Sequence, residues 1–396
     1  MNTHSFHFKN TSIIANHGFD LLKYYASYNL FAFANGMFGI FINILFFTRF
    51  SLLSVMEYQA AIQTTQTIMF ILSGYMLRTT NARTLFSIGT VMRSFIIFGM
   101  VFLKGPFYVP YTFGLLYGIP SGVFWAGNNT LSQAITRKVN RFNFLSTNSA
   151  ISNLAGLLAP LIAGFIVSES PGAGIARYRI DFVISALLLI AAGLIAMTIR
   201  ETGERRKSFG IRDTVIDNPD YLRFKIYFFL SNMLTIAIST FTPVYIFYLT
   251  HSYIIAGLFG TFLAIIAVSS NLSSIYLQKR IGSSYRILIA ITIAASILYA
   301  VRGSFATIAV FAASGIISFL MTPLGNAAMS SFMNFLDRIE YSSGYWINRE
   351  YYLVSGRIVT FLILSVISIA GSSVYDYALA IPALSFTVIG YLKILK

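Results

Sequence analysis

Long apolar runs alternate with short polar turns along almost the whole chain. Each run has about twenty residues, the length that an α-helix needs to cross the hydrocarbon core of a bilayer. The runs lack the two-residue alternation of a membrane β-barrel, so we predict an all-α membrane protein. Twelve spans are expected, at residues 25–47, 58–77, 84–103, 109–134, 143–167, 180–199, 226–249, 253–277, 286–301, 306–330, 346–370 and 374–392.

One polar interruption divides the chain into two halves of about six spans each. It runs from Arg200 to Lys225 and reads RETGERRKSFGIRDTVIDNPDYLRFK. Because both flanks are too apolar for soluble domains, we interpret this stretch as a loop between two membrane halves. The expected organisation is a tail (1–24), an N-terminal half (25–199), a central loop (200–225) and a C-terminal half (226–396).

The composition agrees with a bilayer environment. Hydrophobic residues make up 56% of the chain and charged residues 10%, whereas a soluble domain carries about 25% charged residues. The net charge of +15 is spread over short loops, which disfavours a nucleic-acid surface. The chain has no cysteine, and three of its four histidines precede the first span. We therefore expect no metal site and no cofactor.

The basic residues fall mostly into alternate loops. Most of the 28 lysines and arginines lie on the side that holds both termini and the central loop. By the positive-inside rule this side is cytoplasmic, which predicts a multi-pass protein of the cell membrane with both termini inside. The first run is too long for a signal-peptide core and has no small-residue cleavage site after it, so it is retained as the first helix.

The two halves resemble weak copies of each other. The fourth span, with its loop, reads GIPSGVFWAGNNTLSQAITRKVNRFNFLSTNSA, and the tenth reads SFLMTPLGNAAMSSFMNFLDRIEYSSG. Each has a proline within the span, Pro120 and Pro323, followed by asparagines and a charged turn. Such six-plus-six repetition is typical of transporters whose halves rock about a site at the midplane.

These features make the chain similar to the major facilitator superfamily over nearly its whole length. The family's loop between helices 2 and 3 reads Gly-x-x-x-Asp-Arg-x-Gly-Arg-Lys, and the matching stretch here keeps Gly74, Arg78 and Arg83 without the aspartate. The counterpart between helices 8 and 9 keeps Arg280 and Gly282 but again lacks the acid. The resemblance implies loops that gate the outward-facing state, and the missing acids weaken the expected latch.

Two further motifs resemble the family. Gly156, Pro160 and Gly164 in the fifth span are similar to a Gly-Pro-x-x-Gly-Gly motif associated with antiporters, with alanine at two glycine positions; close packing of small residues is the alternative. The eleventh span carries an Arg-Glu…Gly-Arg pattern that begins at Arg349 and ends with Gly356 and Arg357. That pattern, together with Phe-Trp-x-x-x-Asn in the fourth span, resembles a little-studied subgroup of prokaryotic transporters for which no substrate follows.

Charged side chains within a span are costly, about 2.5 kcal/mol or more near the centre, so each needs a reason. Glu350 is the one carboxylate expected well inside the membrane, because Glu57, Asp181 and Asp376 fall near outer boundaries. Burial favours a protonated carboxyl and a nearby guanidinium favours the charged form, so a rocking motion would load and release a proton. Proton coupling is therefore assigned to Glu350 with Arg349 and Arg357; a structural ion pair is the alternative.

Uncharged polar residues in the spans predict a substrate cavity. Gln63 and Gln66 share one helical face with Gln59. In the superfamily, helices 1, 4, 7 and 10 line the central cavity, so the remaining candidates come from these helices; hydrogen bonding between helices is the alternative for each. The full set is Asn35, Gln63, Gln66, Trp125, Asn128, Asn129, Asn232, Thr235, Tyr245 and Asn326.

These residues predict a secondary active transporter, and not an enzyme, for a small neutral or amphipathic solute. No phosphate-binding loop is present, so energy would come from a gradient, and the proton is the expected coupling ion. The altered fifth-span motif favours efflux, and the family implies a monomer. A receptor or scaffold that kept the bundle but lost coupling is the alternative, favoured by the degraded loops. A lipid-modifying enzyme would need clustered His, Asp or Glu, and no such cluster is found.

Overall fold

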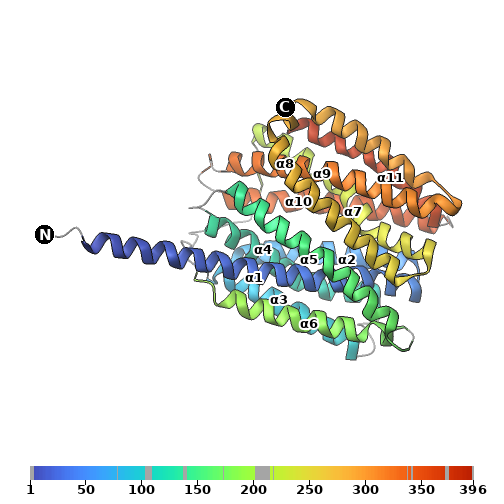
Figure 1. Cartoon of the computed structure of the whole chain (residues 1–396), viewed down its shortest axis with the longest axis horizontal. Helices are drawn as coiled ribbons and strands as arrows, with labels where there is room; N and C mark the ends of the chain where they lie inside the picture. The colour runs from blue at the N-terminus through green and yellow to red at the C-terminus, as the bar shows by residue number, and fades with distance from the viewer. Residues whose placement is uncertain are drawn as a thin grey trace.

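The structure is a computed structural model that describes residues 4–77, 79–102, 109–136, 141–172, 174–200, 215–216, 218–336, 338–339, 342–370 and 374–394. Within these ranges, the side chains of 4–18, 141–143, 145–146, 274–283, 334, 342–343 and 368 are not described. All regular elements in the described ranges are helices, and their long axes run roughly in one direction (Figure 1). This confirms the predicted fold class.

The first half contains six helices, and the second half contains the remainder. The first six are α1 (His4–Arg49), α2 (Leu52–Met76), α3 (Ala82–Phe102), α4 (Pro110–Ile135), α5 (Arg141–Glu169) and α6 (Ile175–Met197). The second half has α7 (Pro219–Thr250), α8 (Tyr253–Ser296), α9 (Ala306–Leu336), α10 (Ser342–Ile369) and α11 (Val374–Ser385), with short 3₁₀ turns at Ile297–Ala300, Gly303–Phe305 and Phe386–Lys393. The last of these turns continues α11 to complete the twelfth span.

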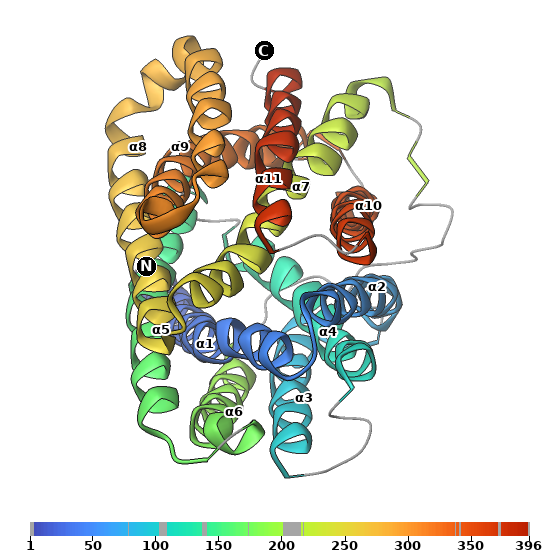
Figure 2. The same ribbon diagram turned by 90° about the vertical axis from the view of Figure 1, so that its right-hand side faces the viewer.

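The helices form two groups when the bundle is seen end on. Figure 2 shows α1 to α6 in one group and α7 to α11 in the other. The groups meet along two seams, where α5 packs against α8 and α2 packs against α10. Helices α1 and α7 meet between the two seams. A site on the midline is therefore bordered by both halves.

Three spans are less apolar or shorter than the others. In the described part of the chain, nine helices are long and apolar enough to cross a membrane. The three others are α2, α4 and the segment Ser284–Ala300, which is apolar but short. Helix α2 carries the glutamines of the predicted polar face, and α4 is rich in glycine. Helix α2 packs against α4 and α10, and α4 packs against α2 and α3, so part of the surface of each faces other helices and need not be apolar.

Glycine spacing explains how α2 and α4 pack so closely. Gly114, Gly118 and Gly122 recur every four residues and lie on one face of α4. A methyl group added at Gly114 would come within 2.5 Å of the Tyr58 carbonyl oxygen, and one at Gly118 within 2.7 Å of the Ile62 oxygen. Only glycine permits this approach, which brings the backbones of the two helices into contact.

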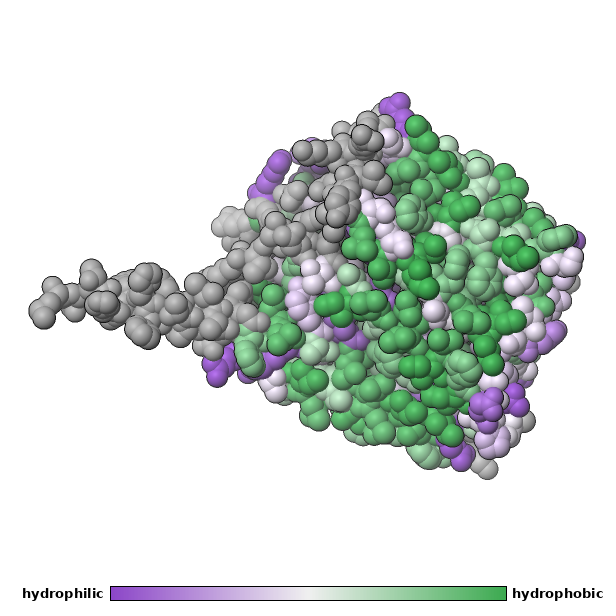
Figure 3. Space-filling model, viewed as in Figure 1, coloured by the Kyte–Doolittle hydropathy of each residue, from purple (hydrophilic) through white to green (hydrophobic). Residues whose placement is uncertain are grey.

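The surface facing outward is strongly apolar. Large side chains such as Phe95, Leu194 and Leu362 are more than half exposed, and hydrophobic residues cover most of the coloured face in Figure 3, with hydrophilic residues gathered toward its ends. A soluble protein would not present such a continuous apolar surface. The molecule is therefore a multi-pass membrane protein, as predicted.

Some element boundaries differ from the sequence expectation. Residues expected to form a tail are helical from His4, and α1 projects beyond the bundle in Figure 1. Helix α7 begins at Pro219, capped by the Asn218 side chain, so the expected central loop is shorter. Helical backbone also replaces the separate loop expected at 278–285. Helix α8 begins at Tyr253, next to the C-terminal end of α7. Tyr299, just after the end of α8, forms a hydrogen bond with Thr242 near that same end of α7. The chain therefore reverses direction within α8.

Candidate functional site

A guanidinium joins the two halves near the middle of the bundle. Arg357 of α10 donates from Nε to Oδ1 of Asn232 on α7 at 3.0 Å. Its Nη1 donates to Oε1 of Gln63 on α2 at 2.8 Å. The first bond lies within the C-terminal half, and the second crosses to the N-terminal half. Hydrogen bonds with a charged donor are among the stronger ones in proteins.

The glycine before this arginine sets its position. Gly356 faces α7, and a Cβ atom there would overlap the carbonyl oxygen of Phe229. The close approach lets Thr360 Oγ1, one turn further along α10, donate to the Met233 carbonyl at 3.4 Å. The Gly-Arg pattern of the sequence thus has a physical basis, because the glycine brings α10 against α7 and the arginine reaches Asn232.

The predicted coupling carboxylate is buried beside an arginine. Glu350 is 7% exposed, and its Oε1 accepts from Nη1 of Arg349 at 3.1 Å. The Arg349 guanidinium also lies over the rings of Phe228 and Trp346, at 5.2 and 5.3 Å from their centroids. Glu350 and Arg357 are seven residues apart, which is about two turns along one face of α10, and no hydrogen bond between them is described. The three predicted coupling residues therefore form one charged group along α10.

A polar pocket of about 230 Å³ lies between the halves, at the seam of α5 and α8. The two helices pack tightly on one side of it: Thr261 Oγ1 donates to the Leu157 carbonyl at 2.6 Å, and Gly257 lies against Pro160. Beyond these contacts the seam is lined by nine uncharged residues, of which four are asparagines. They are Tyr28, Asn148, Ser149, Ser152, Asn153, Ala267, Asn271, Thr322 and Asn326. We call this the amide pocket.

Hydrogen bonds fix some of these amides and leave others available. Asn326 donates from Nδ2 to Oδ1 of Asn271 at 2.9 Å. On the other wall, Ser152 donates to Asn29 at 2.7 Å, and Asn29 donates to Asn148 at 3.4 Å. These bonds orient carboxamides from both halves toward one space. Carboxamides both donate and accept, so the pocket suits a neutral solute with hydroxyl or amide groups.

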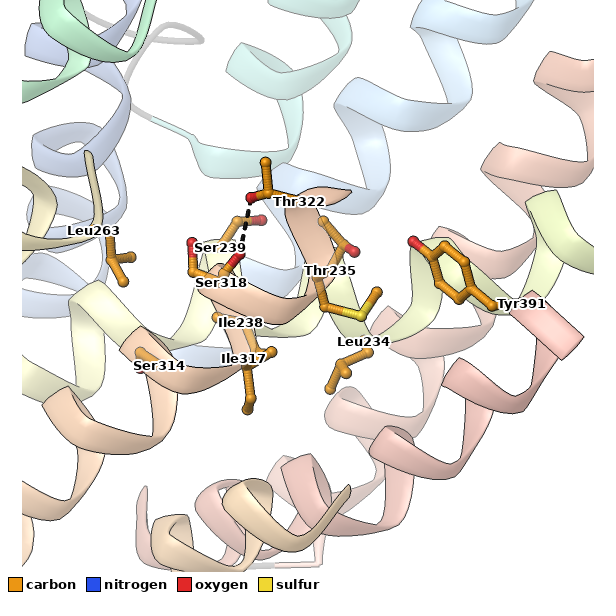
Figure 4. Close-up of a pocket in the computed structure, with 11 residues that line it drawn as sticks. Leu234, Thr235, Ile238, Ser239, Leu263, Ser314, Ile317, Ser318, Thr322 and Tyr391 are labelled. Carbon is orange, nitrogen blue, oxygen red and sulfur yellow. Dashed lines mark hydrogen bonds between the residues drawn. The ribbon is translucent and has the colours of Figure 1, made fainter. Parts of the chain in front are cut away.

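A second pocket of about 330 Å³ lies within the C-terminal half, between α7, α8 and α9 (Figure 4). Most of its lining is apolar, and Thr322 borders both pockets. Thr235, one of the predicted cavity residues, lines this second pocket. The full lining is Leu234, Thr235, Ile238, Ser239, Leu263, Ser314, Ile317, Ser318, Met321, Thr322 and Tyr391. We call this the apolar pocket.

The other predicted cavity residues lie in several environments. Asn35 accepts from Arg93 at 3.5 Å and from Tyr117 at 3.4 Å, inside the N-terminal half. Asn128 accepts from Tyr24 at 2.8 Å, also within that half. Helix-to-helix hydrogen bonding therefore occupies both asparagines in this structure.

Gln66, Trp125, Asn129 and Tyr245 lie outside the linings of both pockets. Gln66 is buried, Asn129 is partly exposed, and the Trp125 ring packs edge-on against Phe124. Tyr245 is fully buried, with its ring stacked on Phe241. The structure thus brings Gln63 and Asn232 together at Arg357, and assigns Thr235 and Asn326 to the pockets.

The residues predicted to gate the molecule also separate. Pro160 and Gly164 pack against α8, whereas a Cβ added at Gly156 would meet nothing within 4 Å. Arg83 donates from Nη1 to the Ile199 carbonyl at 2.6 Å, which ties α3 to the end of α6. Gly74 lies in the last turns of α2. Arg78, and the side-chain surroundings of Arg280 and Gly282, lie outside what the structure describes.

The amide pocket contains residues that the sequence reasoning missed. Asn148 and Ser152, and likewise Ser149 and Asn153, are four residues apart and so share a face of α5. That spacing of polar residues in an apolar span is the signal that would have found them. The predicted cavity residues came only from spans 1, 2, 4, 7 and 10, so α5 was not considered.

Comparisons with known proteins agree on one family. The sequence model of the Major Facilitator Superfamily matches residues 24–339. A crystal structure of a variant of the nucleoside transporter NupG superposes with a TM-score of 0.70 at 12% identity, covering 95% of this chain and 100% of that one. No functionally curated protein matches the sequence.

Similar structures include both conformational states. A bacterial homologue of the iron transporter ferroportin, in its inward-facing state, has a TM-score of 0.65 at 16% identity and covers 95% of this chain and 98% of that one. The transporter FucP in its outward conformation has a TM-score of 0.65 at 15% identity and covers 96% and 98%. At these identities the likeness establishes the fold and carries no substrate.

Proposed function

Because the chain belongs to the Major Facilitator Superfamily, and is thus a membrane transporter, we propose that it moves a small neutral solute by alternating access, with protons as the coupling ion. The amide pocket is the observation that carries this proposal. It lies between the halves, and all nine lining residues are uncharged. A charged substrate such as a dicarboxylate would call for facing arginines.

The arrangement of the halves supports the alternating-access part of the proposal. On one side of the amide pocket α5 and α8 are in close contact, through Thr261 and Leu157. The opposite part of the seam is hollow enough to form the pocket. By the positive-inside count, the hollow side faces the cytoplasm. We therefore interpret the structure as closed toward the outside.

Proton coupling is assigned to the charged group on α10. Glu350 is buried and paired with Arg349, and Arg357 links the same helix to the N-terminal half. A movement between the halves that breaks the Gln63 bond would free the Arg357 guanidinium to move relative to Glu350. Such a change alters the preference of a buried carboxyl for its proton. Conformation and protonation are thereby coupled through one helix.

The direction that we propose is export, with solute leaving as a proton enters. The basis is the similarity of the fifth-span motif to the antiporter motif. In the structure, Pro160 and Gly164 form part of the closed seam with α8. We also propose that the chain acts as a monomer in the cell membrane, with both termini cytoplasmic.

Flux in liposomes tests this function. Purified protein is reconstituted with a pH-sensitive dye inside, and a panel of sugars, glycosides, amino acids and small amphipathic cations is added outside. Wild type should show a solute-dependent pH change that Glu350→Gln abolishes. Glu57→Gln, which changes an exposed carboxylate on α2, should behave as wild type. Alkalinisation as solute enters indicates antiport, and acidification indicates symport.

Three outcomes contradict parts of the proposal. Equal proton flux in wild type and Glu350→Gln would remove the coupling role from Glu350. Solute flux without any pH change would remove the proton as coupling ion. No flux and no binding for any neutral solute would favour the receptor alternative.

A further inference from the structure

The amide pocket and the apolar pocket share a wall, and this suggests that they act together. Thr322 of α9 lines both. In Figure 4 its hydroxyl is bonded back toward Ser318 at one margin of the apolar pocket; Oγ1 donates to the Ser318 carbonyl at 2.8 Å. One turn of α9 therefore presents Thr322 to the polar space and Ser318 to the apolar one.

Several hydroxyl groups in the apolar pocket donate to carbonyl oxygens of their own helices. Thr235 donates to the Ser231 carbonyl at 3.0 Å, Ser239 to Ile236 at 3.2 Å, and Ser314 to Val310 at 2.7 Å. A hydroxyl that has donated its proton offers a ligand only a lone pair. With Leu234, Ile238 and Ile317 around them, these side chains present a mainly apolar wall.

The amide pocket offers the complementary chemistry. Asn153 and Ser149 line it, and no hydrogen bond of their side chains is described. The Asn326 amide uses one donor on Asn271 and keeps its carbonyl oxygen available. Neutral donors and acceptors from both halves therefore face this space, which is the set that recognises hydroxyl groups on a ring or chain.

The volumes favour a ligand that occupies both spaces. At about 230 Å³ the amide pocket falls below the range of roughly 300–1,000 Å³ that small-molecule sites occupy. The apolar pocket reaches about 330 Å³ but has few polar groups to orient a ligand. Because Thr322 borders both pockets, a ligand that reached from one to the other would have a polar end and an apolar end.

We propose that the substrate is a neutral polyhydroxylated molecule carrying a flat apolar ring, of the aryl glycoside class. Its hydroxyl groups bind the asparagines of α5 and α8, and its ring enters the pocket between α7 and α9. This inference rests on the proposed transport function, and it adds a substrate class and a second subsite. Export of such a molecule would require the ring to leave the C-terminal half before the solute passes outward.

A matched pair of probes tests the two-part site. Equilibrium binding to the purified full-length protein is measured by calorimetry for phenyl β-D-glucopyranoside and methyl β-D-glucopyranoside. Both probes carry the same sugar with the same hydroxyl groups, and they differ only in the group on the anomeric oxygen, which is phenyl in one and methyl in the other. We expect wild type to bind the phenyl compound at least tenfold more tightly, because about six carbons leave water for an apolar wall.

Filling the apolar pocket should remove this difference. Ser318→Leu places an isobutyl group in the pocket, and Ile238→Phe fills it from the α7 wall. Either variant should bring the two affinities within about twofold of each other and leave the methyl compound's affinity unchanged. Ser355→Leu, on an exposed position of α10, is the matched control and should keep the tenfold preference. Thermal unfolding of each variant checks that it is folded.

Equal binding of both probes to wild type would overturn the inference, and so would an equal loss of both in the filled variants. Failure of both probes to bind would also overturn it. The proton-flux assay on the wider panel decides the transport function separately, so a transporter with another substrate class would be distinguished from a protein that transports nothing.

Discussion

The guanidinium of Arg357 and the carboxamide of Gln63 join the two halves of the molecule near the middle of α10 and α2. Nη1 donates to Oε1 at 2.8 Å, and Nε of the same group donates to Asn232 at 3.0 Å. This hydrogen bond connects α2 of the N-terminal half to α10 of the C-terminal half. Any rocking of one half against the other must break it or carry it along.

Removing the Gln63 carboxamide should shift the balance between conformations. A hydrogen bond to a charged group contributes about 1.5–3 kcal/mol, so Gln63→Ala should change the ratio of the two conformations by about tenfold or more. Gln59→Ala is the control, because Gln59 donates to Asn43 within the N-terminal half. Solute flux should change in the first variant and stay within about twofold in the second. Equal effects would mean that the bond does not couple the halves.

A methyl group at Gly356 should destabilise the protein. It would overlap the Phe229 carbonyl oxygen, and overpacking of this kind costs about 1–3 kcal/mol. Gly156→Ala is the matched control in α5, where an added Cβ meets nothing within 4 Å; alanine favours a helix over glycine by about 1 kcal/mol, so this variant should be neutral or slightly stabilised. Thermal unfolding in detergent measures both. Similar unfolding temperatures for the two variants would show that α7 and α10 are not in close contact.

Replacing Arg349 alone should reduce the stability of the protein more than replacing both Arg349 and Glu350. Arg349 and Glu350 are 14% and 9% exposed in their side chains. Breaking a buried pair from one side costs about 3–5 kcal/mol, because the remaining charge is left without a partner. Arg349→Gln should therefore lower the unfolding temperature strongly, and the double variant with Glu350→Gln should recover most of the loss. Additive losses in the double variant would mean that the two side chains do not interact.

Asp181 should be a destabilising residue. It is 0% exposed in α6, and no described donor reaches either carboxylate oxygen. A carboxyl in such a place is costly at neutral pH, because its ionised form lacks a partner and its neutral form must hold a proton that the unfolded chain would release, so Asp181→Asn should raise the unfolding temperature at neutral pH by several degrees. Asp376→Asn is the control, since Asp376 is 39% exposed and lies 3.9 Å from Arg302; its removal should change stability by less than about 0.5 kcal/mol. A lower unfolding temperature for Asp181→Asn would reveal a partner for this carboxylate.

Most of the spans were predictable because their hydrophobic length defines them. Hydrophobic length misplaced Asp181, because the span expected at 180–199 puts this residue near a membrane boundary. Helix α6 begins earlier, at Ile175, so Asp181 lies about a turn and a half inside it. The same signal also failed at the turn between the eighth and ninth spans, where the backbone remains helical through residues 278–285. Short polar stretches between apolar runs do not say whether the backbone leaves the helix.

Individual residues of the candidate site could be predicted from the sequence, but their arrangement could not. Gln63 and Arg357 each stood out as polar groups in apolar spans, but they are 294 residues apart in sequence. Their pairing depends on how the two halves dock, which no local pattern encodes. Asn148 and Asn153 could have been found by their spacing on α5, whereas their union with Asn271 and Asn326 required the tertiary structure.

The central claim is that two halves rock about the Arg357 contact, and distances between spin labels test it most directly. The chain has no cysteine, so labels attach only where cysteines are introduced. One pair, Val109→Cys with Phe305→Cys, spans the halves at the side closed in this structure, and a second, Thr79→Cys with Arg338→Cys, spans them at the opposite side; all four positions are exposed.

In liposomes, each pair should show two distance populations, and Gln63→Ala should shift the two pairs in opposite senses. A gain of longer distances at Val109 and Phe305 must accompany a gain of shorter distances at Thr79 and Arg338. A single unchanged distance for both pairs, in wild type and in Gln63→Ala alike, would contradict the account.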